Sequence, residues 1–229
     1  MTHAATTSSL AARGRYAIHF AGRECGEERW SVARAADGAH VATGEQHLLA
    51  PHPFPSRQEY RATLSPLGRV TGLEVRWTIG ARALVARHAA DGDLWRVRLE
   101  VDGQVREQEG DYPTFCEVLY GTHVFHTFAL RRYVLAPGAA HEFPALVIGP
   151  PFMAVEPGRQ RLRCTAEEER ATPFGPRRAR RIELGDAGGS LEPPFAMWVD
   201  EHDVVLESLE GVEPAGPWMR LVEYERERG

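Results

Sequence analysis

Between Gln58 and Val101 the chain alternates apolar and polar residues, and this alternation constrains the fold more than any other feature of the sequence. The alternating stretches are residues 58–64, 73–79, 84–86 and 95–101, with glycine-containing turns between them. A period of two residues is typical of a strand with one buried and one solvated face. Hairpins this regular indicate neighbouring antiparallel strands. The sequence therefore predicts a mostly β fold: a single strongly curved antiparallel sheet, a half-barrel, with a large apolar inner face.

The length of the chain favours one large domain. A chain of 229 residues can bury roughly 70% of its unfolded surface, so it needs no disulfide or metal to hold it together. All-β sandwiches and barrels of this size commonly fold as one unit. Residues 1–13 are rich in Ala, Thr and Ser, which is typical of a disordered tail. We expect such a tail at 1–13 and one half-barrel domain at 14–229.

Charge and composition exclude several classes of function. The net charge is -5, with both signs spread along the chain, so no nucleic-acid partner is expected. The sequence contains no lysine and no asparagine. Neither a Schiff-base lysine nor a phosphate-loop lysine can therefore exist, and N-linked glycosylation has no acceptor.

The cysteines and the apolar runs bear on the compartment. Cys25, Cys116 and Cys164 are isolated, odd in number and without a C-x-x-C motif, so they do not form a disulfide framework. No run of 18 apolar residues could span a membrane, and residues 1–14 lack the apolar core of a secretory signal. We expect a cytoplasmic protein without a membrane span.

The spacing of apolar residues in the sequence changes at Asp111. Asp111 suits a helix N-cap and Pro113 a first helical turn. Apolar residues then recur at helical spacing. This predicts a helix over 113–131, or two short helices broken near Gly121. Since it is apolar over much of its circumference, we expect it to lie against the concave face of the sheet.

Two charged segments are interpreted as structural features. The basic run at 177–181 is typical of an exposed edge strand guarded by charge, with an anion site as the alternative. Such an edge would allow a weak dimer, although its charge favours a monomer. Residues 200–203 place Asp200, Glu201, His202 and Asp203 between two apolar strands, which favours a solvated turn. A cation site or an acid–base site is the alternative there.

The order of these parts resembles a known group of proteins. A strand carrying GRECGEE at residues 22–28 leads into hairpins and an aromatic helix. A second sheet section follows and ends in MWVDEHDVVLESLE at residues 197–210. This arrangement, over about residues 15–224, is similar to the LolA/LolB-like half-barrel superfamily and to uncharacterised glycolipid-binding families related to it. The resemblance implies a curved sheet that wraps around helices and encloses an apolar cavity. It implies no catalytic residue.

A cluster of polar residues accompanies the predicted helix. Cys116, Glu117, His123 and His126 lie on or near one helical face, with His141 downstream. Three interpretations remain open: a metal site, a Cys116 nucleophile activated by a histidine, and polar side chains that line a pocket. The spacing matches no established zinc motif, so no metal and no cofactor is expected.

The inner face of the predicted sheet is the candidate ligand site. Its aromatic side chains could surround an apolar ligand, and any of Glu27, Glu28, Gln58 and Glu59 that points inward, as the parity predicts for Gln58, could orient a head group. The same stripe also has the composition of a plain core. The candidate binding residues are Gln58, Tyr60, Trp77, Trp95, Phe115, His123, Phe125, His126 and Trp198.

Three classes of function follow. The first is binding or carriage of a hydrophobic small molecule, such as a lipid, glycolipid or polyketide-like compound. The second is an enzyme in the same cavity, a cyclase, isomerase or hydrolase, in which His123, His126, Glu117 or Cys116 would act. The third is a protein-binding scaffold that uses a free sheet edge. The first class accounts best for the apolar inner face.

Overall fold

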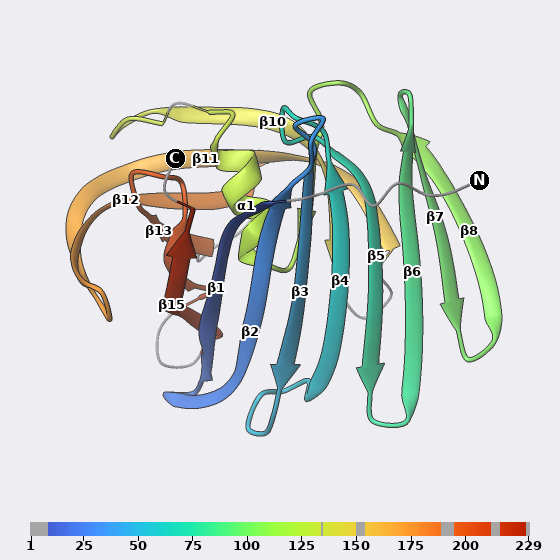
Figure 1. The fold of residues 1–229 in the computed structure, drawn as a ribbon, viewed down its shortest axis with the longest axis horizontal. Coiled ribbons are helices and arrows are strands. Elements are labelled where there is room, and N and C mark those ends of the chain that lie inside the picture. The colour runs from blue at the N-terminus through green and yellow to red at the C-terminus, as the bar shows by residue number, and fades with distance from the viewer. Residues whose placement is uncertain (1–8, 134, 150–153, 189–194, 212–215, 228–229) are drawn as a thin grey trace.

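The computed structural model of the protein describes residues 9–133, 135–149, 154–188, 195–211 and 216–227 (Figure 1). These residues form one sheet of 15 strands and one short helix. The sheet is strongly curved and does not close, which confirms the predicted mostly β half-barrel.

The sheet contains both short and very long strands. The strands are β1 (Ser9–Phe20), β2 (Arg23–Arg34), β3 (His40–Leu48), β4 (Ser56–Leu64), β5 (Val70–Ile79), β6 (Arg82–Asp91), β7 (Leu94–Val101), β8 (Gln104–Asp111), β9 (Glu117–Tyr120), β10 (Ala140–Gly149), β11 (Ala154–Thr172), β12 (Gly175–Asp186), β13 (Phe195–Val199), β14 (Val205–Leu209) and β15 (Trp218–Arg226), and the helix is α1 (His123–Leu130).

The first half of the sheet is the predicted meander. Strands β1 to β8 lie in chain order, each paired antiparallel with the next. In β4 the side chains alternate strictly between buried and exposed, with Gln58 and Tyr60 among the buried ones. Trp77 of β5 and Trp95 of β7 are buried on the same face. The inward parity predicted from the sequence is confirmed for these residues.

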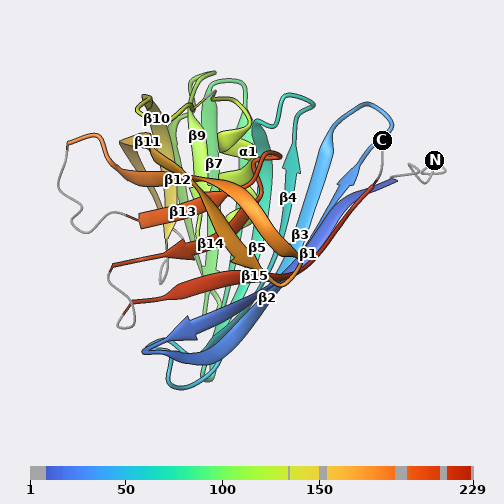
Figure 2. The ribbon, with the colours of Figure 1, turned by 90° about the vertical axis from the view of Figure 1, so that its left-hand side faces the viewer.

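Strand β1 joins the two halves of the sheet. It pairs with β2 on one side and with the last strand, β15, on the other. Beyond β15 the order is β14, β13, β12, β11, β10 and β9, so the second half runs backward along the chain (Figure 2). β9 is parallel to β10. The two outermost strands, β8 and β9, therefore come from segments adjacent in the sequence.

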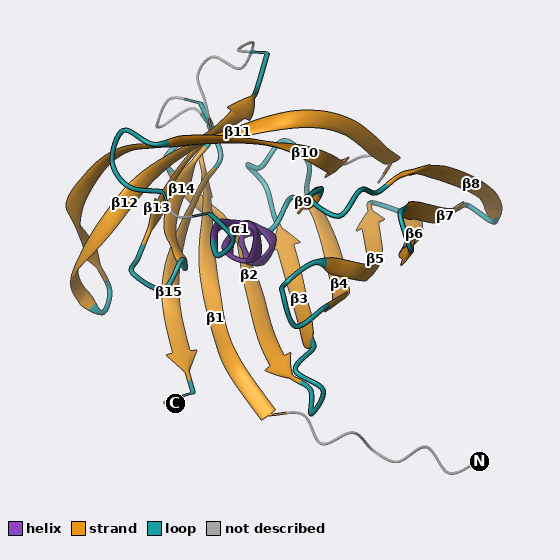
Figure 3. Ribbon diagram, turned by 90° about the horizontal axis from the view of Figure 1, so that it is seen from above, coloured by secondary structure: helices purple, strands orange, loops and turns teal. Residues whose placement is uncertain are grey.

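Helix α1 lies inside the curve of the sheet, as predicted. Figure 3 shows it nearly end-on, with β1–β3 on one side and β10–β12 on the other. Its predicted length is wrong, because the helix begins only at His123 and residues 117–120 form β9 instead. All four residues of β9 are buried. A short strand buried on both faces is a continuous apolar run, which periodicity cannot distinguish from a buried helix.

The basic run at 177–181 does not lie at a sheet edge, so that interpretation is wrong. It belongs to β12, which pairs with β11 on one side and, at Arg180 and Arg181, with β13 on the other. Three arginines of the run pair with carboxylates: Arg178 with Glu167, Arg180 with Asp203, and Arg181 with Glu183. Ion pairing across and along the strands, rather than protection of an edge, accounts for the charge.

Two further predictions concern boundaries. Strand β1 begins at Ser9, so residues 9–13 of the expected tail pair with β2 and β15, and residues 1–8 lie outside the described residues. The predicted turn at 200–203 is confirmed: the Asp200 carboxylate accepts hydrogen bonds from the backbone N–H groups of His202 and Val204 at 2.8 and 2.9 Å. These two bonds make it an Asx turn.

The long β11–β12 hairpin covers the outer face of the C-terminal strands. Ser208 of β14 contacts the helix, so the preceding residue, Glu207, points to the outer face. There Arg170 of the hairpin bonds to Glu207 and lies 4.4 Å from the centre of the Trp198 ring. Residues 205–208 are consequently all buried. Among the described residues there is no helix that is long and apolar enough to cross a membrane.

Candidate ligand-binding site

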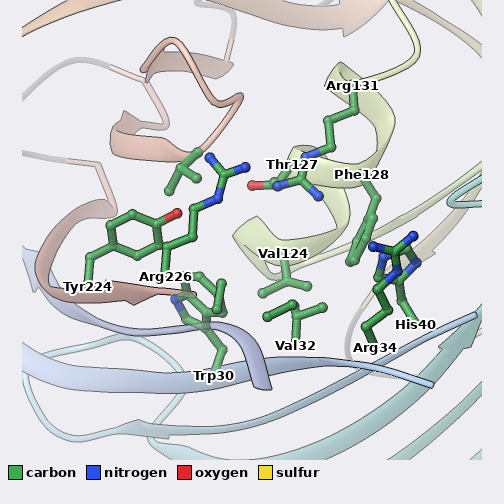
Figure 4. A pocket seen from close by; sticks show the side chains of 13 residues that line it. Trp30, Val32, Arg34, His40, Val124, Thr127, Phe128, Arg131, Tyr224 and Arg226 are labelled. Carbon is green, nitrogen blue, oxygen red and sulfur yellow. The ribbon is translucent and has the colours of Figure 1, made fainter. Parts of the chain in front are cut away.

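A small pocket lies between α1 and the strands that face it. Its walls come from α1, β1, β2, β3 and β15 and from Val204, just before β14. Its volume is about 180 Å³. Figure 4 shows Val32 and Val124 facing each other across it, with Trp30 beside them and several nitrogen-bearing side chains around the opening.

One face of α1 is turned toward this pocket. Val124, Thr127, Phe128 and Arg131 line it. They follow one another at intervals of three, one and three residues, which places them on one side of a helix. The neighbouring face carries Phe125, which packs against the rings of the inner sheet, so the helix separates the pocket from the aromatic core.

The alternation of side chains along β2 places three of its residues on the floor of the pocket. Trp30, Val32 and Arg34 share the inward parity, and all three line the pocket. Gly14 of β1 is the cross-strand partner of Trp30. A Cβ at that position would lie 2.8 Å from Cζ2 of the indole. The glycine therefore allows the Trp30 ring to lie close over the backbone of β1.

Three guanidinium groups border the pocket: Arg34, Arg131 and Arg226. Figure 4 shows Arg131 and Arg226 extending toward each other near Thr127. Within the described part of the chain, none of the three forms an ion pair with a carboxylate. Burial lowers the pKa of His40, and the charges of Arg131 and Arg34 lower it further. The opening of the pocket therefore carries a net positive charge, because three guanidinium groups border it while the Asp200 carboxylate is the negative group that acts on Tyr224 among the described residues.

Two hydrogen-bonding groups of the pocket have no partner among the described residues. They are the indole Nε1 of Trp30 and the hydroxyl of Tyr224. Trp30 is only 7% exposed, so water does not readily satisfy its N–H group. An unsatisfied buried donor costs about 1–3 kcal/mol. Both groups are available to an acceptor atom of a ligand.

The size of the pocket limits its occupant. An apolar cavity of about 150 Å³ holds one benzene molecule. The observed volume of about 180 Å³ therefore suits one ring or a short branched chain. A longer ligand has to leave through the opening, past the arginines.

Glu28 begins a buried polar network on the inner face of β2. Its side chain is 0% exposed, and the Tyr60 hydroxyl donates to its Oε1 at 3.1 Å. Gln58 donates to Gln46 at 2.6 Å, and the Tyr120 hydroxyl donates to Gln58 at 2.7 Å. Burial raises the pKa of Glu28 to about 8, against the opposing effect of hydrogen bonds from Tyr60 and Gln46. Glu28 is thus mainly a neutral acid at pH 7, and the amide predicted to orient a ligand, Gln58, is bonded to the protein instead.

The two helix histidines are core residues and do not line the pocket. His123 Nε2 shares a hydrogen bond of 2.7 Å with the Ser208 hydroxyl. The ring of His126 lies 5.3 Å from that of Phe195. Burial lowers the pKa of His123 well below its usual value and that of His126 to about 4. Both imidazoles are therefore neutral at pH 7.

The predicted aromatic residues are distributed over three places. Phe125 packs against Tyr60 at 6.1 Å between ring centres, within the inner core. Trp77 and Trp95 belong to the same core, farther along the meander. Trp198 lies under Arg170 on the outer face. The placement of Phe115 on the helix is wrong: it precedes β9 in a loop and is 80% exposed. The structure does not bring these residues together around one cavity.

Cys116 and Glu117 are buried near β9, away from the histidines. Glu117 accepts a hydrogen bond from the Tyr133 hydroxyl at 2.9 Å and pairs with Arg132 at 3.2 Å. Burial raises the pKa of the Cys116 thiol to about 11, which opposes formation of a nucleophilic thiolate. His141 stacks on Tyr133 at 4.3 Å. In the described ranges, no group of three or more His, Cys, Asp and Glu side chains is placed to hold a metal ion.

A second depression lies at the far end of the inner face, over β6–β8. Its volume is about 570 Å³, and Val97, Leu99 and Val101 form its apolar part. Arg106 lines it without an ion pair to any described residue. Every residue of β8 is exposed, so this groove is open to solvent. It lacks the covering helix that encloses the smaller pocket.

The sequence contains signals for the smaller pocket beyond the aromatic stripe that predicted a ligand site. Arg34 continues the inward parity of Trp30 and Val32, and Arg226 continues that of Tyr224. Arg34 and Arg226 are exposed, so they interrupt the apolar parity of β2 and β15 where the pocket opens to solvent. What the sequence could not supply is the convergence of β2, β15 and α1 on one space.

Comparison with known proteins gives a fold but no family. No protein-family model matches the sequence, and a search of curated proteins finds no match. The structure is similar to a β-barrel-like protein of a domain of unknown function, DUF1849, from Brucella abortus, with a TM-score of 0.60 and 6% sequence identity. That likeness covers 97% of this chain and 100% of the other, and it supports a barrel-like fold alone.

A second solved structure is similar, with a lower TM-score. It is a DUF1089 family protein from Pseudomonas aeruginosa, 17% identical, with a TM-score of 0.49 over 78% of this chain and 87% of the other.

Proposed function

We propose that this protein binds a small molecule whose apolar part occupies the pocket between α1 and β2. The observation that carries the proposal is the space of about 180 Å³ enclosed by Trp30, Val32, Val124 and Phe128 within the concave side of the sheet. Protein interiors are close-packed and leave few voids larger than a water molecule. Burial of the ligand's apolar surface here contributes about 25 cal/mol per Å² before the costs of association.

The ligand classes suggested by the sequence stay within this proposal, with a limit on size. A lipid, glycolipid or polyketide-like compound would place one ring or a short acyl segment in the pocket and extend the rest through the opening. The resemblance to LolA/LolB-like half-barrel carriers supports a carrier or sensor of this kind. A cytoplasmic location is part of the proposal and is supported by the thiols of Cys25, Cys116 and Cys164, which are free.

An enzyme in the same cavity is the weaker proposal. It would require an acid or base that faces the ligand. His40 lines the pocket, and burial and the charges of Arg131 and Arg34 lower its pKa, but none of His123, His126, Glu117 and Cys116 lines it. Neutral, buried histidines and a protonated thiol provide no activated group there. We therefore assign binding and no catalytic residue.

Filling the pocket tests the proposal. Val32→Phe and Ala12→Leu each place extra side-chain atoms in the space, so either should abolish binding of one-ring probes, measured by calorimetric titration with benzoate and benzamide. Two variants are used because one of them could unfold. Val105→Phe, on the exposed strand β8, is the matched control and should bind normally. Normal binding by folded Val32→Phe and Ala12→Leu would contradict the proposal.

A further inference from the structure

The arginines around the pocket differ from most arginines of this protein. Outside the pocket, guanidinium groups commonly face carboxylates, as in Arg13 with Glu225 and Arg96 with Glu109. Arg34, Arg131 and Arg226 border one small space, and none has such a partner among the described residues. Like charges gathered on one opening repel one another unless a counter-ion lies between them.

Three neighbouring groups add hydrogen-bonding capacity without adding negative charge. Trp30 Nε1 and the Tyr224 hydroxyl have no partner among the described residues, and the Thr127 hydroxyl lies near the Arg131 and Arg226 guanidinium groups in Figure 4. No carboxylate side chain lines the pocket within the described residues. The donors therefore converge on a site that offers an incoming molecule cations and N–H and O–H groups.

We propose that the ligand of this pocket carries an anionic group, a carboxylate or a phosphate, attached to an apolar part about the size of one ring. The inference rests on the proposed function and adds the chemistry of the head group. The anion lies at the opening, where Arg131 and Arg226 approach each other, and Arg34 contributes from the end of β2. The ring lies against Val32 and Val124.

The energetics favour an acid over a neutral compound of the same shape. A guanidinium group can bond to a carboxylate or phosphate through two parallel N–H···O contacts, which are about twice as strong as hydrogen bonds between neutral groups. An anion also removes the repulsion between the arginines. Arg34, Arg131 and Arg226 are exposed, so added salt should weaken this attraction. A neutral amide gains the apolar burial but neither of the other two contributions.

The groove over β6–β8 provides an internal comparison. Arg106 is also without an ion pair among the described residues, but its groove is open and is lined as well by Arg82, Asp102 and Glu107. Arg29, on β2, points to the outer face and pairs with Glu27 at 2.9 Å. Arg106→Gln therefore tests an unpaired guanidinium, and Arg29→Gln tests loss of one positive charge on the strand that carries Trp30 and Arg34.

The experiment is a calorimetric titration of the full chain with benzoate, its neutral isostere benzamide, and phenyl phosphate. We expect benzoate and phenyl phosphate to bind at least about tenfold more tightly than benzamide, as is typical of hydrogen bonds to a charged group. Arg131→Gln and Arg226→Gln should each weaken benzoate about tenfold and leave benzamide within about twofold. Arg29→Gln and Arg106→Gln should leave all three affinities unchanged.

The outcomes separate this inference from the function on which it rests. If benzoate and benzamide bind equally and Val32→Phe abolishes both, the pocket binds ligands but the anionic head group is refuted. If Arg106→Gln weakens benzoate and the pocket variants do not, the ligand uses the groove and the inference is overturned. If no probe binds, the proposed function fails together with the inference.

Discussion

Side chains of β4 alternate between buried and exposed along its whole length, whereas residues 205–208 of β14 are buried without interruption. Both strands belong to the same sheet. β4 is covered on its inner face alone, while β14 lies between α1 on one side and the β11–β12 hairpin on the other. The first half of the molecule is thus a single-faced sheet in solvent, and the second half is locally a three-layer structure.

The two halves also differ in the partners that surround a buried carboxyl group. Among the described residues no cation pairs with Glu28 of β2, which is held by the neutral side chains of Tyr60 and Gln46. Glu207 of β14 is bonded to Arg170 and Arg220. Where one layer covers the sheet, a carboxyl group remains as the neutral acid. Where a second layer brings arginines across the outer face, it forms ion pairs.

The largest expected effect is the loss of stability when a buried side chain of β14 is truncated, compared with truncation on the solvated face of β4. Leu206→Ala removes a residue that is 5% exposed and should lower the free energy of unfolding by about 2–4 kcal/mol. Arg61→Ala, on the solvated face of β4, should change it by less than about 0.5 kcal/mol. Urea titrations give both values. Equal effects would mean that β14 is not enclosed as the comparison requires.

Loss of the paired carboxylate should have the next largest effect. Glu207→Ala leaves Arg170 and Arg220 without their partner and should cost about 2–3 kcal/mol, less than a fully buried pair because both arginines are partly exposed. Glu107→Ala in the meander removes an exposed pair with Arg98 and should cost less than about 0.5 kcal/mol. A Glu107→Ala effect as large as that of Glu207→Ala contradicts the three-layer description.

The pH dependence of the stability of Glu28→Gln should show whether Glu28 is a neutral acid in the folded protein. The pKa of Glu28 in the folded protein, about 8, lies above its ordinary value of 4.5. The folded state therefore keeps a proton that the unfolded state releases, so Glu28 makes the wild type less stable as the pH rises from about 4.5 to about 8. The amide introduced by the substitution does not titrate. The stability of the variant relative to wild type should rise by about 2 kcal/mol between pH 5 and pH 7, at up to about 1.4 kcal/mol per unit. A difference that does not change with pH would rule out the neutral acid.

The sequence predicted the single-faced half well for a physical reason. In β4 and β5 one face meets water, so the alternation that placed Tyr60 and Trp77 inside is imposed by the environment and visible in the residues. In β9 and β14 both faces are buried, and the alternation disappears. The helix was therefore predicted too long. The basic run of β12 was assigned to an edge because the charges alone do not show which strands pair beside it.

The sequence predicted the kind of site but not its position in the fold. An apolar concave face with polar groups was expected, but Trp30 and Val32 of the observed pocket were not among the predicted binding residues. The arginines come from the ends of three elements, β2, α1 and β15, that are brought together by the pairing of the first strand with the last. That pairing spans nearly the whole chain, and no local pattern specifies it.

The indole N–H of Trp30 tests the central claim most directly. The chain has five tryptophans, so five indole signals are expected in a proton–nitrogen correlation spectrum, and Trp30→Phe identifies the one that matters. On titration with benzoate, we predict that the Trp30 signal moves and saturates while those of Trp77 and Trp95 stay in place. A Trp30 signal that does not move, with shifts confined to the groove around Leu99 or absent altogether, would contradict the account.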